Sequence, residues 1–296
     1  MRYVEQMICN TAYDFLELAV YDEEDEAELK KYADEPNICL EMQMLPFLRY
    51  FHCVQRIILK PGELSPDGLT HLYAHKQLMA LKIDYFEDDV QGAYAIDLSQ
   101  FPKLEMLCAK NAYDFYNVGD CDSLRMLQVY EWDFLDFETL KNTKLDTLVI
   151  SKGKAKSFSG IENLPLRILA ASHLPVSSVE PINTLSSIQF LELECCNRLN
   201  DIEQLASPSL EYLILSGKGE VANLQFLKQN PNLRRIIFEY TVSDCDLSEF
   251  DCFEKVVLLQ NKKGYNRTDR LLPKNSNPYL VEGIPTWRFY FNNRNL

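Results

Sequence analysis

The chain has 296 residues, of which 47% are hydrophobic and 25% are charged, so it can fill a core and does not have the composition of a disordered protein. Its 30 Lys and Arg residues against 44 Asp and Glu residues give a formal net charge of -14 at pH 7. Such a surface repels nucleic-acid phosphates and anionic lipid headgroups and attracts cationic partners. The charge therefore argues against nucleic acid as a ligand.

The cysteines and the first residues bear on the compartment. Nine cysteines occur without a CxxC pair or a repeating metal spacing, which predicts reduced thiols in an intracellular core. The first 15 residues have neither the continuous apolar region nor the cleavage site of a signal peptide, and no apolar run approaches the ~18 residues of a membrane span. We expect a cytoplasmic protein with no membrane contact.

Residues 1–36 do not carry the repeat that follows. Residues 22–35 contain eight acidic side chains against Lys30 and Lys31, and they include an AELKKYA segment before Pro36. Acidic residues at a helix N-terminus are favoured by the helix dipole. We predict a short helix here and an N-terminal cap over residues 1–36, because the first repeat of a solenoid otherwise exposes an apolar end.

A spacing of Leu, two residues, Leu, one residue, apolar recurs through the rest of the chain. Between residues 145 and 238 it occurs five times, with first positions 21, 22, 22 and 23 residues apart. Less regular copies precede and follow it, which gives ten fairly clear units and an eleventh if Ile38 and Leu40 form an earlier one. The in-phase copies begin at Leu145, Leu166, Ile188, Leu210 and Leu233, and the others at Val54, Leu78, Leu104, Leu124 and Phe253.

Within each unit the apolar residues alternate, which predicts a short parallel strand with these side chains pointing into the solenoid. Between strands, segments such as LNDIEQLASPS place apolar residues three or four apart and end in Pro, Ser or Asn. These segments predict a turn of α or 3₁₀ helix on the opposite side.

GIENLPLRILAAS and DIEQLASPSLEYLILSG resemble leucine-rich repeat proteins, especially the bacterial and phosphatase-regulator types with ~21 to 23 residues per repeat. The resemblance implies an α/β solenoid with a curved parallel β-sheet on the concave side and short helices or 3₁₀ turns on the convex side. It covers residues 38–261, and we assign residues 37–262 to the solenoid. The family places Asn at the ninth position of each unit, where its amide bonds to neighbouring backbone, but here only Asn261 conforms.

Residues 263–296 form the predicted C-terminal cap. Three prolines interrupt this segment, and Trp287, Phe289 and Phe291 alternate with polar or aromatic residues as a final half-buried strand would. From Gln260 onward, seven basic residues stand against two acidic ones. This end of the chain is therefore basic, while the remainder is strongly acidic.

No motif for catalysis is present. The sequence has neither a GxxxxGK phosphate loop nor a GxSxG nucleophile elbow. His71 and His75 lie four residues apart, the spacing of a metal pair on a helix, but no third ligand follows, and the adjacent Cys195 and Cys196 have the pattern of ordinary thiols at a strand end. We expect no catalytic, cofactor or metal site and no enzyme activity.

The repeat phase predicts which strand residues point away from the core, because neighbours of inward residues point outward. Apolar, aromatic and acidic residues at these positions have the composition of a protein-binding surface. The alternative is that some of them pack sideways against adjacent strands. The predicted protein-binding residues are Met126, Tyr130, Trp132, Ile168, Phe190, Glu192, Glu194, Tyr212 and Ile214.

These features predict a non-catalytic protein that captures a protein partner on its sheet. Its acidic charge favours a basic partner, such as a toxin or effector that an immunity-type inhibitor neutralises. The alternative is a regulatory or targeting adaptor subunit that recruits a cellular enzyme. The oligomeric state is open, and a self-assembling scaffold would need no outside partner.

Overall fold

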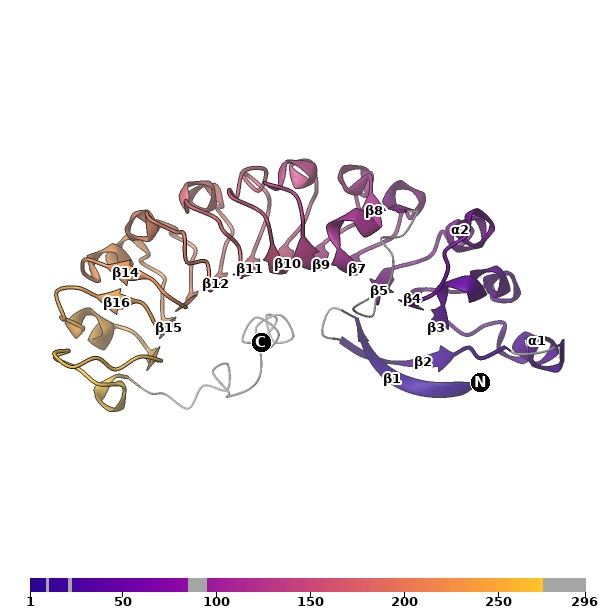
Figure 1. Ribbon diagram of the computed structural model, residues 1–296, viewed down its shortest axis with the longest axis horizontal. Coiled ribbons are helices and arrows are strands. Elements are labelled where there is room, and N and C mark those ends of the chain that lie inside the picture. Colours follow the sequence, from indigo (N-terminus) through magenta and orange to yellow (C-terminus); the bar gives the residue numbers. More distant parts are fainter. Residues whose placement is uncertain (9–10, 21–22, 85–94, 274–296) are drawn as a thin grey trace. The chain divides into compact units, whose positions relative to one another are not determined.

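The computed structural model describes residues 1–8, 11–20, 23–84 and 95–273. These residues belong to two compact units. The first unit holds residues 1–130 and 142–144, and the second holds residues 131–141 and 145–296. In both units the strands run along one side and the helical turns along the other (Figure 1). This is the two-sided unit that the repeat pattern predicts.

The first unit contains most of the longer helical segments. Its strands follow the sheet order β1-β2-β3-β4-β5-β7-β9, with β1 and β2 antiparallel and β2 to β7 parallel. A separate pair is made by β6 (Ile96–Asp97) and β8 (Phe115–Tyr116), and β9 ends in the second unit. The other elements are β1 (Arg2–Ile8), β2 (Thr11–Glu17), α1 (Glu23–Leu29), β3 (Asn37–Glu41), β4 (Arg56–Lys60), α2 (Pro66–Tyr73), β5 (Ala80–Ile83), β7 (Met106–Asn111) and β9 (Met126–Trp132), with 3₁₀ turns at Lys30–Tyr32, Met42–Tyr50, Leu98–Gln100, Ala112–Asp114 and Val118–Asp120.

The second unit is the more regular one. Six parallel strands follow one another in the sheet without interruption, and the short β14 (Glu220–Val221) and β16 (Thr241–Val242) form a separate parallel pair. The six strands are β10 (Thr147–Gly153), β11 (Ile168–Ser172), β12 (Phe190–Glu194), β13 (Tyr212–Ser216), β15 (Arg235–Phe238) and β17 (Lys255–Leu258), with 3₁₀ turns at Glu138–Leu140, Glu180–Thr184, Ile202–Gln204, Gln225–Gln229, Ser248–Cys252 and Asp269–Leu271.

The strand register confirms the predicted repeat phase. In the second unit the middle apolar residues pair in one row that contains Leu148, Leu169, Leu191, Leu213, Ile236 and Val256, all with no accessible surface. In the first unit the corresponding row contains Ile38, Ile57, Leu81 and Leu107, so the least regular copy is also a repeat. Burying such a side chain stabilises the fold by about 1.5 to 3 kcal/mol, so each inward row is a major part of the core.

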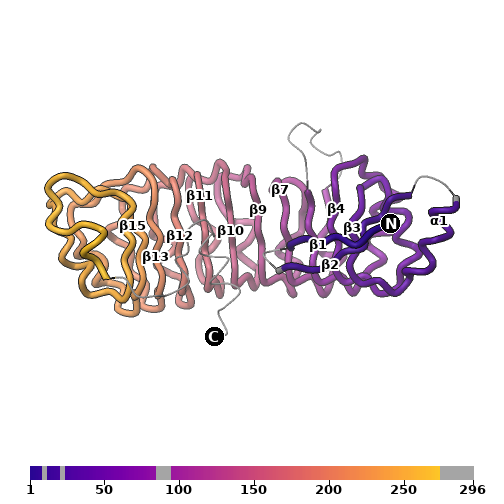
Figure 2. Tube along the Cα trace, turned by 90° about the horizontal axis from the view of Figure 1, so that it is seen from below, coloured from indigo at the N-terminus to yellow at the C-terminus, as the bar shows by residue number. Residues whose placement is uncertain are grey.

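The N-terminal region contains the predicted helix and an element that was not predicted. The helix α1 and the following 3₁₀ turn occupy the acidic run. Before them, β1 and β2 form a hairpin, in which β2 continues the sheet beside β3 and β1 lies close to β5 and β7. Figures 1 and 2 show the hairpin lying across the strand side of the first repeats. The predicted final strand at residues 287–291 lies outside the described residues.

The hairpin pairs with the basic side chains that the repeat phase places on the first strands. The guanidinium of Arg56 lies 4.3 Å from the ring centre of Tyr13, and Lys60 forms an ion pair with Glu17, which also binds Arg2. The Glu17 carboxylate therefore offsets charge on Lys60, whereas the uncharged ring of Tyr13 covers the guanidinium of Arg56 and leaves its charge in place. The hydrogen bonds from Arg2 and then Lys60 lower the pKa of Glu17.

The amides of the buried Asn230 and the half-buried Asn183 connect repeats on the side of the helical turns. Asn230 donates to the carbonyl oxygen of Leu205 at 3.0 Å and accepts from the amide of Ser207 at 2.8 Å. Two repeats earlier, Asn183 bonds to the same loop from the other side: it donates to the carbonyl oxygen of Gln204 at 2.9 Å and accepts from the amide of Ala206 at 3.0 Å. These bonds satisfy loop backbone groups that no strand partner reaches. Amide bridging thus occurs at positions other than the ninth.

We predict that Asn230→Ala destabilises the protein by about 1 to 3 kcal/mol, because the Ser207 amide and the Leu205 carbonyl lose their partner inside the protein. Urea unfolding measures the change. The control is Asn232→Ala, which removes one exposed bond to Pro208 and should cost no more than about 0.5 kcal/mol. Equal losses in the two variants would contradict the structural role of Asn230.

We predict that Glu17→Gln weakens the hairpin by about 1 kcal/mol, a typical upper value for a partly exposed ion pair. Because the folded pKa of Glu17 is lowered, its contribution is present above the ordinary glutamate pKa and is lost as the pH falls through the lowered value. Amide hydrogen exchange in β1 at pH 7 measures the effect.

The exposed Glu5 lies on the same hairpin, so Glu5→Gln is a control with the same change of charge. It should leave the exchange rates of β1 unchanged. Faster exchange in Glu5→Gln than in Glu17→Gln would show that general charge, rather than the Arg2 and Lys60 contacts, holds the hairpin.

Candidate protein-binding face

Strand β12 places its side chains alternately in the core and on the opposite face. Leu191 and Leu193 are buried in the core, so Phe190, Glu192 and Glu194 share the other face. Register with β11 and β13 arranges that face into three rows across the strands. The rows are Ile168, Phe190 and Tyr212; Ala170, Glu192 and Ile214; and Ser172, Glu194 and Ser216. Six of the predicted site residues therefore meet on one face of the second unit.

The structure differs from the expectation in how accessible the apolar members are. Ile168, Phe190, Tyr212 and Ile214 are buried, whereas Glu192 and Glu194 are partly exposed. Phe190 and Tyr212 stack at 5.9 Å between ring centres, and the guanidinium of Arg235 lies 4.8 Å from the ring centre of Tyr212. Sideways packing between adjacent strands thus uses much of the apolar surface, as the alternative interpretation held. Their contact with a partner stays a prediction.

The three predicted residues on β9 have different environments. Tyr130 is 53% exposed, whereas Met126 and Trp132 are buried. The indole of Trp132 stacks on Phe137 at 4.9 Å, and its N–H donates to the carbonyl oxygen of Asp136 at 2.8 Å. Trp132 is therefore a core residue rather than a rim residue. Trp132 occupies the ninth position of its repeat, where leucine-rich repeat proteins usually have an Asn that bonds to neighbouring backbone. Its position in the repeat could therefore have identified it as an inward residue.

Glu192 is the electrostatically unusual residue of the face. Burial, with a further contribution from the neighbouring Glu194 carboxylate, raises its pKa to about 7. Its Oε2 atom is inaccessible and has no hydrogen-bond partner among the described residues. A carboxylate in this position is unfavourable when ionised, because it has lost water and gained no compensating donor. The repeat phase predicted that Glu192 lies on this face but gave no indication that its carboxyl is largely buried.

Polar groups surround the carboxyl ends of the same strands. The hydroxyl of Ser172 lies 2.7 Å from Nδ1 of His173, and the amide of His173 donates to the carbonyl oxygen of Glu194 at 2.8 Å. One repeat further, the amide of Gly217 donates to Oε2 of Glu239 at 2.6 Å. This edge of the sheet is thus polar and carries the carboxylates of Glu194 and Glu239.

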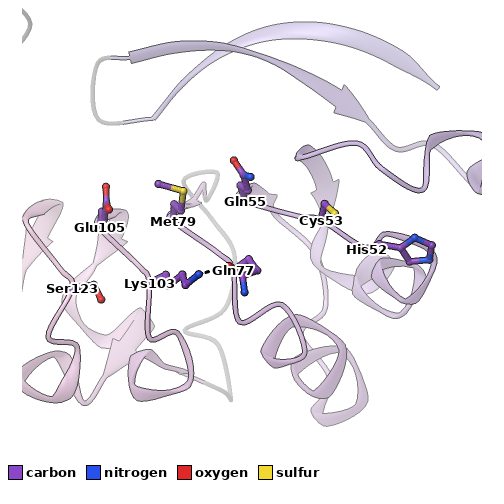
Figure 3. A pocket seen from close by; sticks show the side chains of 8 residues that line it. All are labelled: His52, Cys53, Gln55, Gln77, Met79, Lys103, Glu105 and Ser123. Atoms are coloured by element: carbon purple, nitrogen blue, oxygen red, sulfur yellow. Dashed lines mark hydrogen bonds between the residues drawn. The ribbon is translucent and has the colours of Figure 1, made fainter.

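A groove in the first unit was not predicted from the sequence. It encloses about 430 Å³ and takes its lining from successive repeats (Figure 3). Gln55, Met79 and Glu105 each precede a strand, and Nζ of Lys103 lies 2.5 Å from Oε1 of Gln77. The remaining lining residues are His52, Cys53 and Ser123. This mixture of polar side chains suits a peptide or polar ligand, and only the stacking of repeats brings it together.

The described part of the chain holds neither a metal-binding cluster nor a membrane-spanning helix. Across residues 1–8, 11–20, 23–84 and 95–273, no group of three or more His, Cys, Asp or Glu side chains could hold a metal ion. Within the same ranges, no helix has the length and hydrophobicity to cross a membrane. Burial raises the pKa of the Cys196 thiol to about 12, so this thiol stays protonated at neutral pH.

We predict that Glu192→Gln stabilises the protein at pH 8 by about 1 to 3 kcal/mol relative to the wild type. A raised folded pKa means that wild-type stability falls as the pH rises from the unfolded glutamate value towards about 7, and then stays level. The glutamine variant lacks this loss, so the two proteins should have equal stability near pH 4. Urea unfolding at several pH values measures the difference.

The exposed Glu180 in the 3₁₀ turn at residues 180–184 provides a control on the other side of the unit. Glu180→Gln makes the same change of charge and should follow the wild-type pH dependence. A Glu192→Gln curve parallel to the wild-type curve would show that Glu192 is not the group responsible.

No family model matches the chain, and no curated protein matches it. Among solved structures, the chain is similar to an internalin (InlF) from Listeria monocytogenes, at 12% identity and a TM-score of 0.45, over 81% of this chain and 71% of that one. It is also similar to the functional domain of InlJ from Listeria monocytogenes, which includes a cysteine ladder, at 14% identity and a TM-score of 0.36, over 75% of this chain and 62% of that one. Its own in-phase repeats and parallel strands give the chain the fold of leucine-rich repeat proteins.

Proposed function

We propose that this protein is a non-catalytic binding protein that holds a basic protein partner against the sheet face of its second unit. The observation that carries the proposal is the pair of carboxylates, Glu192 and Glu194, on a continuous face of parallel strands. A stacked-repeat sheet offers a long surface that suits a folded partner. Carboxylates on it favour a partner that presents Lys or Arg.

The proposed partner class is a basic toxin or effector, which makes the protein an immunity-type inhibitor in the cytoplasm. A net charge of -14 accelerates association with a cationic protein, because opposite fields steer the two molecules together. Inhibition of a toxin requires fast and tight capture, and both are favoured by complementary charge over an extended interface. The absence of catalytic motifs from the sequence is compatible with this role.

The second candidate is an adaptor that recruits a cellular enzyme. The groove in the first unit favours it, because an adaptor needs a surface for each of two proteins. Tyr130, which is also in the first unit, adds an exposed aromatic side chain of the type that anchors interfaces. An inhibitor needs only one surface, so binding of two proteins at once would favour the adaptor.

Affinity purification from the native cell identifies a partner, and stopped-flow kinetics then test the charge argument. We predict that the association rate falls at least tenfold between low and high salt, because screening removes long-range attraction. Glu194→Lys should slow association more than Glu180→Lys, because Glu194 lies on the proposed face and Glu180 on the opposite side. Salt-independent association, or equal effects of the two variants, would contradict a charge-steered interface at this face.

A further inference from the structure

The surroundings of Glu192 have the chemistry of a slot for one cationic side chain. Its neighbours across the strands are Ala170 on β11 and Ile214 on β13, both buried and apolar. The next row along the strands supplies Glu194 between Ser172 and Ser216, all partly exposed. A side chain that enters from the exposed row therefore meets polar acceptors first and apolar walls beside the deeper carboxyl.

Two independent observations point to a missing ligand at this position. The Oε2 atom of Glu192 is buried and accepts no hydrogen bond within the described part of the chain. Glu194 follows two residues later on the same face, so two acidic groups lie side by side, and Glu192 has no cationic partner among the described residues. A buried acceptor without a donor is unfavourable, and a cation with N–H groups would satisfy both the acceptor and the charge.

The side chains around Glu192 suit an organic cation better than a metal ion. Only two acidic side chains meet here, and the described residues contain no group of three or more His, Cys, Asp or Glu side chains that could hold a metal ion. An ammonium group has three donors and needs only three acceptors, and a guanidinium can pair with a carboxylate in a fork. The apolar Ala170 and Ile214 suit the aliphatic stem that both side chains carry.

We propose that a lysine or arginine side chain of a basic protein partner binds between Ala170 and Ile214 and pairs with the carboxylates of Glu192 and Glu194. This proposal rests on the proposed function, because it names the contact through which the sheet face recognises its partner. The interaction brings a donor from the partner to the Oε2 atom of Glu192, which solvent does not reach and which accepts no hydrogen bond within the described part of the chain. It therefore gives the face a preference for cationic side chains at one defined place.

Binding in this slot should depend on pH through Glu192. The cation needs the ionised carboxylate, so affinity rises as the pH increases through about 7 and a proton is released on binding. The charged and titratable groups on the surrounding strands are Glu194, Tyr212, Arg235 and, beyond the strand ends, His173 and Glu239. Arg235 lies over the ring of Tyr212, one row away from Glu192.

The experiment uses the full chain and blocked Gly-Ser peptides that carry three lysines, three arginines or three norleucines. Carbon-detected NMR of the glutamate carboxyls, assigned with Glu192→Gln, follows the titration of Glu192 with and without each peptide. The lysine or arginine peptide should shift the Glu192 midpoint to lower pH, and its affinity should rise about tenfold between pH 6 and pH 8. The norleucine peptide should do neither, and the stronger of the two cationic peptides identifies the preferred side chain.

Matched variants separate the slot from general attraction to an acidic surface. Glu192→Gln should remove the pH dependence of peptide affinity, Glu194→Gln should weaken binding at both pH values, and Glu180→Gln should behave as the wild type. Equal peptide affinity in Glu192→Gln and wild type would overturn the slot. If calcium chloride shifts the titration midpoint of Glu192 and the peptides do not, the site binds a metal ion and the proposal is overturned.

A second copy of the chain is a further occupant that the test distinguishes. Sedimentation showing a wild-type dimer that Glu192→Gln dissociates would place the cation on another copy and overturn the assignment to a separate partner. The slot and the proposed function can fail separately. Peptide titration reports on the slot alone, whereas the salt dependence of association with the native partner reports on charge-steered capture, even if its contacts lie elsewhere.

Discussion

The rest of the structure depends on the parallel hydrogen-bonded ladder that keeps the inward apolar residues of successive repeats in one row. In the second unit this row runs through Leu169, Leu191 and Leu213 without a shift in register. A shift of one residue would move every inward side chain to the opposite face. The same register therefore defines the core and fixes which side chains form the candidate binding face.

Polar groups outside the ladder are satisfied by devices that differ between the two sides. On the side of the helical turns, Asn183 and Asn230 connect the backbone of neighbouring repeats. On the sheet side of the first unit, the N-terminal hairpin supplies Glu17 to Arg2 and Lys60. In both places a side chain from a neighbouring repeat or from the hairpin satisfies polar groups that one repeat alone leaves unpaired. Glu192 is the contrasting case, with a buried acceptor that the described residues leave unfilled.

This contrast links stability to function. Most buried polar atoms in proteins have partners, so a buried carboxyl without one reduces stability for no structural benefit. Such unfavourable groups are common at binding sites, where the ligand supplies the missing interaction. The apolar neighbours Ala170 and Ile214, and the buried row of Ile168, Phe190 and Tyr212, strengthen the effect, because a low local dielectric increases both the penalty without a cation and the attraction to one.

The sequence by itself determined the repeat, the strand positions and the direction of most strand side chains, because alternation within a short strand is a local property; Trp132, at the end of β9, is an exception. It identified the row of Leu191 and Leu213 and the shared face of Glu192 and Glu194. Only the tertiary structure decided exposure, because exposure depends on what neighbouring strands and distant segments place beside each residue. Stacking of Phe190 on Tyr212 and of Trp132 on Phe137 buries predicted anchors. The hairpin places Glu17 against Lys60 and the ring of Tyr13 against Arg56, two basic residues that the repeat phase places outward. The raised pKa of Glu192 has the same cause, because its burial depends on side chains from neighbouring strands that the sequence alone does not bring together.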